Sequence, residues 1–123
     1  MDIVHATEGE RIDIITVSLQ CSPYSTALRM SRGGTLRAGR MQTARCELTA
    51  AAAVIKVLNP RIVIYENVGT LLQKGWEDEW RHIQQILAGA GRRRRWRYQA
   101  IRPERVFREG VRRNRLWMVS WRE

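Results

Sequence analysis

The sequence of 123 residues lacks the features that mark membrane-spanning, secreted and zinc-binding proteins. No apolar run approaches the roughly 18–20 residues that a membrane helix needs. The start, "MDIVHATEGER", has no basic segment followed by an apolar one, so it does not resemble a secretory signal. The two cysteines and two histidines show no CxxC, HxxxH or HExxH spacing, although counting alone leaves a disulfide open. We therefore expect a soluble cytoplasmic protein, with neither a membrane nor a metal as a partner.

Lysine is also scarce, because 20 of the 22 basic residues are arginine. With only 12 acidic residues, the formal net charge is +10. Arginine pairs with phosphates and base edges through a planar fork of donors, so a nucleic acid is the first partner to consider. A GC-rich genome also enriches arginine, and many basic surfaces are only solvated. Composition alone therefore leaves nucleic-acid binding open.

Strand-like and helix-like patterns alternate along the chain. Residues 12–19 and 61–65 are short, β-branched apolar runs, typical of strands buried on both faces of a parallel sheet. Residues 22–43 break every periodicity and predict a long basic loop. From about Arg45, apolar residues at helical spacing predict a helix that Asn59-Pro60 ends, because proline disfavours the α region in the residue before it.

The rest of the chain continues the alternation. Residues 76–90 predict a second helix, and residues 96–101 and 115–121 look like strands. Strands that alternate with helices predict βαβ units and an α/β fold: a partial Rossmann-like, three-layer α/β/α domain with a mostly parallel sheet. In such sheets the chemistry gathers at the carboxyl ends of the strands, and Cys21 and Glu66-Asn67 each lie just beyond one.

Cys21 has three readings: a small core side chain, a redox or metal thiol, or a nucleophile. A thiolate next to a carboxyl group that holds a proton suits one reaction well. The thiolate adds to C6 of a cytosine ring while Glu66 hydrogen-bonds the ring nitrogen N3, which makes C5 a carbon nucleophile. Nearby arginines would favour the thiolate, and the base would have to leave its helix stack.

Three segments, taken in order, resemble the motifs of the DNA cytosine-5 methyltransferases. "IDIITVSLQCSPYS" is similar to the catalytic motif, in which a strand runs into a Pro-Cys pair and an aromatic-Ser. "NPRIVIYENVGTL" matches the proline, short apolar strand and Glu-Asn-Val of the second motif. "EGVRRNRLWMVSW" resembles the third, where two arginines one residue apart precede an apolar strand.

The resemblance implies a role for each matching residue. Cys21 would be the nucleophile, and Glu66 would bind N3 and the exocyclic amine of the flipped base. Arg113 would complete the catalytic set and, with Arg115, steady the base and its backbone. Asn67 would shape the substrate-binding loop.

The resemblance also implies S-adenosylmethionine as the methyl donor and DNA as the partner. Ser25, in the aromatic-Ser pair, would contact the substrate or DNA. A Ser-Arg-Gly-Thr-Leu-like element usually opens a helix near the donor. Two stretches compete for it here: "SRGGTL" at 31–36, and Arg45-x-x-Leu48, which would make Leu48 a donor contact.

The sequence departs from the family in several places. The Phe-x-Gly-x-Gly-Gly donor loop is missing, Gln20 replaces the proline before the cysteine, and Val111 replaces a glutamine in the third motif. Residues 1–123 are thus expected to form one partial catalytic domain, without the donor-binding half and the target-recognition domain. A split subunit paired with a second polypeptide, a truncated remnant and a fragment all fit.

The expected function is cytosine-5 methyl transfer in a prokaryotic or phage-infected cell, with the missing parts supplied. The alternatives are an inactive, arginine-rich remnant that binds nucleic acid, or a half-domain that pairs through its exposed sheet edge.

Overall fold

The computed structural model describes residues 7, 9–19, 34–91, 93–101 and 115–123. These residues form an α/β structure of four strands, two α-helices and one short 3₁₀ helix. In chain order the elements are β1 (Ile14–Ser18), α3 (Gly34–Leu58), β2 (Ile62–Val68), η2 (Gly69–Leu72), α4 (Glu77–Ala88), β3 (Arg94–Ile101) and β4 (Arg115–Arg122). The predicted α/β class is confirmed.

The four strands form one sheet in the order β1-β2-β4-β3. Strands β1 and β2 run parallel, whereas β4 lies antiparallel to both of its neighbours, β2 and β3. The prediction of a mostly parallel sheet is therefore wrong for the described strands. Strand direction depends on which distant segments pair, and the local alternation of strands and helices does not encode that choice.

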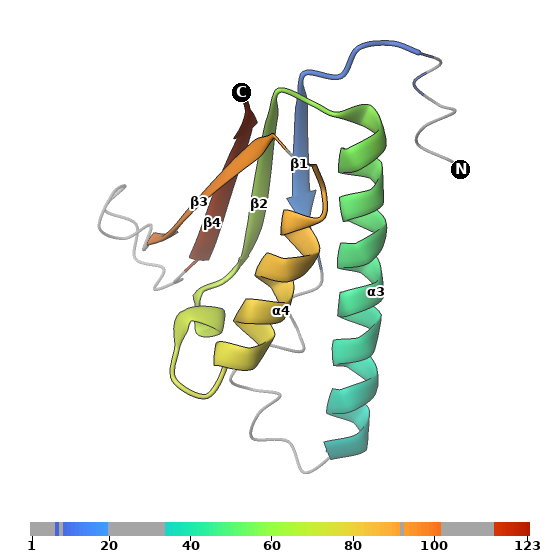
Figure 1. Cartoon of the computed structure of the whole chain (residues 1–123). Helices are drawn as coiled ribbons and strands as arrows, with labels where there is room; N and C mark the ends of the chain where they lie inside the picture. Colours follow the sequence, from blue (N-terminus) through green and yellow to red (C-terminus); the bar gives the residue numbers. More distant parts are fainter. Residues whose placement is uncertain (1–6, 8, 20–33, 92, 102–114) are drawn as a thin grey trace, which may run out of the picture.

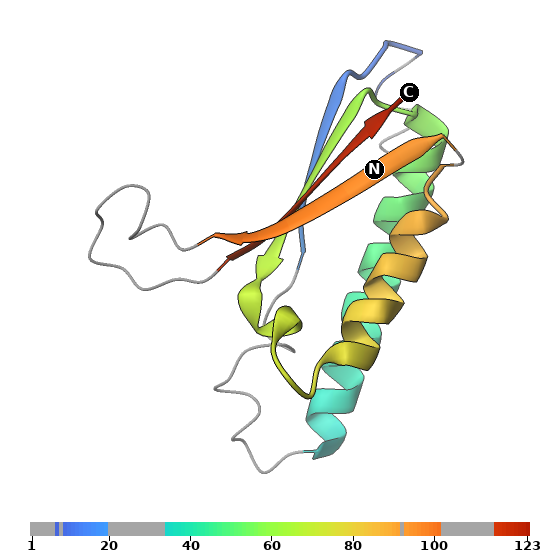
Figure 2. The ribbon, with the colours of Figure 1, turned by 60° about the vertical axis from the view of Figure 1, so that its left-hand side comes forward.

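Both α-helices lie on the same face of this sheet (Figure 1). The view in Figure 2 shows the sheet nearly edge-on, with α3 and α4 on one side of it. The described residues thus form two layers instead of the expected three. Side chains of β1 alternate: Val17 is buried towards the helices, while Ile14, Thr16 and Ser18 are exposed. The prediction that this strand is buried on both faces is wrong as well.

Helix α3 owes its packing to the apolar stripe that the sequence predicts, since Leu48, Ala52 and Ile55 are all buried. The helix ends at Leu58, as expected. Asn59 takes a left-handed φ of 44°, and its N–H donates to the carbonyl of Ile55 at 2.8 Å. Pro60 follows and has no N–H with which to extend the helix.

The start of α3 differs from the prediction. The helix begins at Gly34, so residues 34–43 are helical, and the predicted basic loop is wrong over that part. These residues carry few apolar side chains at helical spacing, which is why the sequence pattern indicated a helix only from about Arg45.

Helix α4 buries one apolar face, as predicted from the spacing of Trp76, Ile83 and Leu87. A partly buried ion pair joins it to α3: the half-exposed Arg45 guanidinium contacts Glu79, whose side chain is 6% exposed. The Arg45 Nε donates to Glu79 Oε2 at 3.4 Å, so the contact uses two nitrogens and both carboxylate oxygens. The pair fixes the helices side by side over the sheet.

The face of the sheet away from the helices is rich in exposed apolar side chains. Because successive side chains of a strand point to opposite faces, the neighbours of the buried residues point to this face. The most exposed of them are Ile14 (56%), Val119 (40%), Ile62 (37%) and Trp117 (37%). Trp117 therefore lies outside the core. None of the helices in the described part is long and apolar enough to cross a membrane.

Candidate functional site

The carboxylate of Glu66 is held on the uncovered face of the sheet by one residue from each neighbouring strand. The Ser18 hydroxyl of β1 donates to Glu66 Oε2 at 2.9 Å. The Arg115 Nε of β4 lies 3.5 Å from Glu66 Oε1. The side chains of Arg115 and Glu66 are 27% and 22% exposed, so the carboxylate is partly shielded but still reachable from solvent.

Strand register explains why these three side chains meet. Ser18 lies opposite Glu66 in the parallel pair of β1 and β2. Arg115 lies opposite Val68, which shares the face of Glu66 because it is two residues further along β2. Glu66 and Val68 thus belong to the strand itself, and the prediction of a loop directly after residue 65 is wrong.

The structure brings together two of the residues that the sequence indicated, Glu66 and Arg115, although they are 49 positions apart. It also adds Ser18, which sequence reasoning missed. The period of two along β1, combined with a parallel register to β2, is the signal that could have found it. Ser18 is the last residue of β1, and Cys21 follows it by three residues in the sequence.

Asn67 points to the opposite face and is buried, with 2% of its surface exposed. Its Nδ2 donates to the Tyr65 hydroxyl at 2.7 Å, and its Oδ1 accepts from the N–H of Val68 at 2.7 Å. Burial raises the pKa of Tyr65 to about 12, against a smaller opposing effect of the Asn67 hydrogen bond. Asn67 therefore fixes the backbone and side chains next to Glu66 from beneath the sheet.

Leu48, expected as a donor contact, lies in the hydrophobic core with 3% of its surface exposed. Its position on the buried stripe of α3 gives it a packing role in this structure. Cys21, Ser25 and Arg113 lie outside the described residues, and their predicted roles stay predictions.

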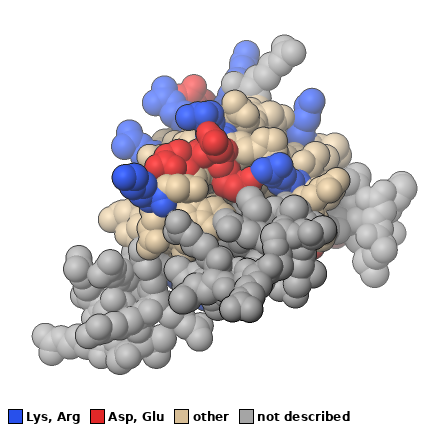
Figure 3. All heavy atoms as spheres, turned by 90° about the horizontal axis from the view of Figure 1, so that it is seen from below, with Lys and Arg blue, Asp and Glu red and all other residues tan. Residues whose placement is uncertain are grey.

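The end of the molecule that carries the Glu66 site has mixed charge. Viewed from this end, acidic side chains gather near the centre of the described surface, with lysines and arginines around them (Figure 3). The first turn of α4 contributes two exposed acidic residues, Glu77 and Asp78, beside the buried Glu79. Among the described residues, no group of three or more potential ligands is arranged to hold a metal ion.

The site therefore presents a carboxyl group with two exchangeable partners, one neutral and one cationic. Such a group can hydrogen-bond a heterocycle that carries a ring nitrogen next to an amine. The neighbouring guanidinium can contact a phosphate or a carbonyl oxygen of the same ligand.

No protein-family model and no curated protein matches this sequence. The solved structures that share its fold include two methyltransferases. One is described as a DNA modification methyltransferase encoded within a prophage (E. coli), with a TM-score of 0.64 and 13% identity over 98% of this chain. The other is the Entamoeba histolytica methyltransferase EhMeth, with a TM-score of 0.56 and 13% identity over 96% of this chain. The chain spans only 30% and 34% of their lengths, so the shared fold covers about a third of each of these proteins.

Proposed function

We propose that this chain, starting from its methyltransferase fold, is the nucleophile-bearing and base-binding part of a DNA cytosine-5 methyltransferase. The observation that carries the proposal is the Glu66 carboxylate, held by Ser18 and Arg115 at the carboxyl ends of two parallel strands. The order of the Cys21, Glu66-Asn67-Val68 and Arg113-x-Arg115 motifs supports this particular reaction. Residues 1–123 then make up a single partial catalytic domain.

Chain geometry supports a joint role for Cys21 and Glu66. Cys21 follows Ser18 by three residues, so their Cα atoms lie within about 11 Å of one another. Ser18 in turn contacts Glu66 directly. A base flipped out of its stack could therefore meet the thiolate and the carboxyl group at the same time.

The chain's own residues would carry the covalent steps. The Cys21 thiolate forms a bond to C6, and Glu66 stabilises at N3 the charge that the addition pushes into the ring. The addition leaves C5 electron-rich, which is the state that methylation of this carbon requires. Once C5 carries its substituent, loss of the C5 proton to solvent and expulsion of the Cys21 thiolate would restore the aromatic ring.

Arg115 has a part in this scheme because it competes with the base for the Glu66 carboxyl group. When the base binds, Arg115 would leave Glu66 and contact the DNA backbone, together with Arg113. Asn67 would keep Glu66 in place through its hydrogen bonds beneath the sheet, while Ser25 would contact the DNA near the nucleophile.

The methyl group in this reaction would come from S-adenosylmethionine, the electrophilic donor that the proposed family uses. The described residues do not fit a donor site, because Leu48 is packed in the core and the sequence contains no Phe-x-Gly-x-Gly-Gly loop. We therefore derive no step through the donor, and we propose that a separate α/β part supplies its site.

The open edge of β1 supports such a partner. In the described sheet, β1 has a neighbouring strand on one side only. Beside it lies a largely apolar hollow of about 420 Å³, which β1 and α3 line mainly with Ile15, Val17, Leu19, Ala51 and Val54. The similar solved structures are about three times as long as this chain. We place the donor-binding part at this edge, where it would extend the sheet and cover the hollow.

Exchange of the C5 proton tests the proposal without the donor. Duplex DNA carrying cytosine tritiated at C5 is incubated with the chain, and the tritium released to water is counted. Addition of Cys21 to C6 should release it, and Cys21→Ser and Glu66→Gln should each lower the rate by at least about 100-fold. The matched control Glu10→Gln, an exposed acid ahead of the start of β1, should not change the rate.

The net positive charge of the chain supports a second candidate function, that of an arginine-rich remnant that binds DNA without catalysing a reaction. It would show salt-dependent DNA binding and no tritium release, even after a donor-binding partner is added. That result would refute the methyltransferase proposal and support the remnant.

A further inference from the structure

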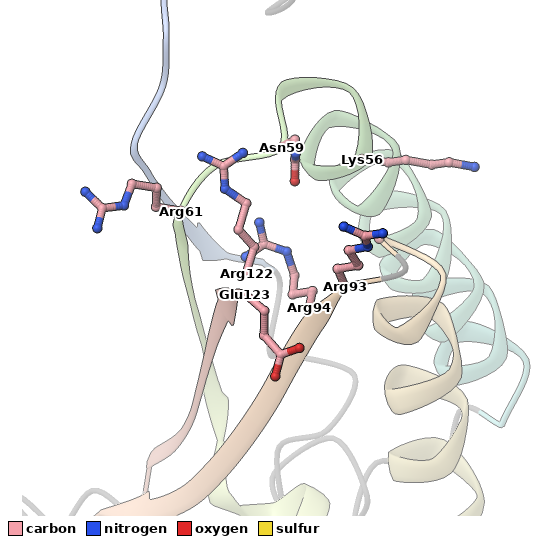
Figure 4. Close-up of a pocket in the computed structure, with 8 residues that line it drawn as sticks. Lys56, Asn59, Arg61, Arg93, Arg94, Arg122 and Glu123 are labelled. Carbon is pink, nitrogen blue, oxygen red and sulfur yellow. The ribbon is translucent and has the colours of Figure 1, made fainter.

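A basic hollow of about 890 Å³ opens at the end of the molecule opposite the Glu66 site (Figure 4). It lies where α3 and α4 end, where β2 and β3 begin, and where β4 ends. The residues that line it are Lys56, Asn59, Arg61, Gly91, Arg93, Arg94, Arg122 and Glu123. Arg61 precedes Glu66 by five residues of nearly extended chain, so about 17 Å separates the two sites.

Positive side chains dominate this hollow. Five of its lining side chains are cationic and one, Glu123, is anionic. Glu123 is already engaged, because it pairs with the Nε of Arg95. Arg93, Arg94 and Arg122 surround the opening, while Lys56 and Arg61 extend from its rim on either side (Figure 4).

Arg94 is fixed in this cluster by two hydrogen bonds, although one of its buried nitrogens has no partner in the described part of the chain. Its NH2 group donates to the carbonyl of Pro60, and its NH1 group lies 3.3 Å from the Ser120 hydroxyl. Its Nε is buried and has no hydrogen-bond partner among the described residues. Burial, and after it the nearby charge of Arg122, lower the pKa of Arg94.

The ends of the two helices do not neutralise this charge. A helix carboxyl end carries the equivalent of about half a negative charge, so α3 and α4 together contribute about one. The lining side chains carry a net excess of four positive charges. An anion with several oxygens would relieve their mutual repulsion and occupy the donors that protein groups leave free.

We propose that this hollow is a phosphate-binding site, separate from the Glu66 site, that takes the phosphate groups of a nucleic-acid backbone. The planar fork of arginine matches two phosphate oxygens, which a halide cannot offer, and a nucleic-acid backbone presents such groups repeatedly along its length. Free phosphate compounds offer the same chemistry, and the test below separates the two sources.

The test uses the whole chain labelled with ¹⁵N and follows the Nε–Hε signals of its arginines. Inorganic pyrophosphate and a 12-base-pair duplex are titrated in separate experiments. The test variant is Arg93→Gln with Arg122→Gln, which leaves Arg94 and its contacts to Pro60 and Ser120 in place. The matched control removes two arginines outside the hollow, Arg81→Gln with Arg97→Gln.

If the site binds phosphate, the test variant should lose at least about tenfold in affinity for pyrophosphate, whereas the control should keep its affinity. For the duplex, the slope of log affinity against log salt should become shallower by about 2, because two phosphate contacts are lost. Pyrophosphate binding without this change in the duplex slope would identify a free phosphate compound as the ligand.

Absence of shifts at Arg94 and Arg122 with both probes would overturn the proposal, as would equal losses in the test and control variants. The readout needs neither Cys21 nor a methyl donor. Failure of the tritium-release assay would therefore leave the phosphate site standing, and the reverse also holds.

Discussion

Replacing Asn67 with alanine should destabilise the fold far more than the loss of one surface amide would. The change removes two hydrogen bonds of 2.7 Å, one to the Tyr65 hydroxyl and one from the Val68 N–H. Tyr65 is 1% exposed, so its hydroxyl would stay buried without this partner. An orphaned buried polar group costs about 1–3 kcal/mol. Adding about 1 kcal/mol for the partly buried Val68 N–H gives an expected loss of about 2–4 kcal/mol.

Urea unfolding followed by tryptophan fluorescence measures this loss, with a double-mutant cycle to isolate the contact. Tyr65→Phe alone should cost about 1 kcal/mol, because it leaves the Asn67 amide without this acceptor. In the Asn67→Ala background the same change should be neutral or stabilising, since it removes the orphaned hydroxyl. Gln99→Ala, an exposed amide on β3, is the control and should stay within about 0.5 kcal/mol.

The result that would refute this reasoning is additivity. If the double variant loses the sum of the two single losses to within about 0.5 kcal/mol, the two side chains are not coupled. Asn67 would then not stabilise the segment beneath Glu66 in the way the geometry indicates.

Three further predictions concern the same core. Burial raises the pKa of Tyr65 to about 12 in the folded state, against about 10 when unfolded; its contribution of about 2–3 kcal/mol is present below pH 10 and lost as pH rises towards 12. Urea titrations across that window should show the loss, and Tyr65→Phe should abolish it. Arg45→Met should cost about 1–3 kcal/mol, because it leaves the buried Glu79 carboxylate without its half-exposed partner, whereas Glu79→Gln should cost less. Equal losses in the two variants would contradict that asymmetry. Ile55→Ala should cost about 2–5 kcal/mol by the same urea assay, because Ile55 is fully buried; a loss below about 1 kcal/mol would place it outside the core.

Local patterns predicted the helices better than they predicted the sheet. The stripe through Leu48 and Ile55 and the stop at Asn59-Pro60 follow from residues only a few positions apart, and the structure confirms both. The direction of β4 depends on its pairing with β2, about 50 positions earlier, and no local signal carries that information. The sequence also did not show that β4 is buried on one face only. Its exposed face carries apolar residues such as Trp117 and Val119, so the strand lacks the polar alternation that would reveal this.

The sequence motifs predicted individual residues of the candidate site. The contacts between them depend on strand register, which the sequence did not reveal. Glu66 and Arg115 were both named from their motifs, but only the strand pairing shows that they touch. Ser18 carries no motif, so it emerged from the register alone. Extending β2 by three residues would have placed Glu66 and Asn67 on opposite faces, because side chains alternate along a strand.

The uncovered face of the sheet has a consequence for handling the chain in a cell or a tube. Ile14, Ile62, Trp117 and Val119 face water in the described structure, next to a strand edge that has free backbone donors and acceptors. Contiguous apolar surface beside an open edge favours self-association and attracts chaperones and proteases. We therefore expect the yield of soluble chain to rise when a partner that covers this face is produced in the same cell. Purification would then start from co-expression of the two.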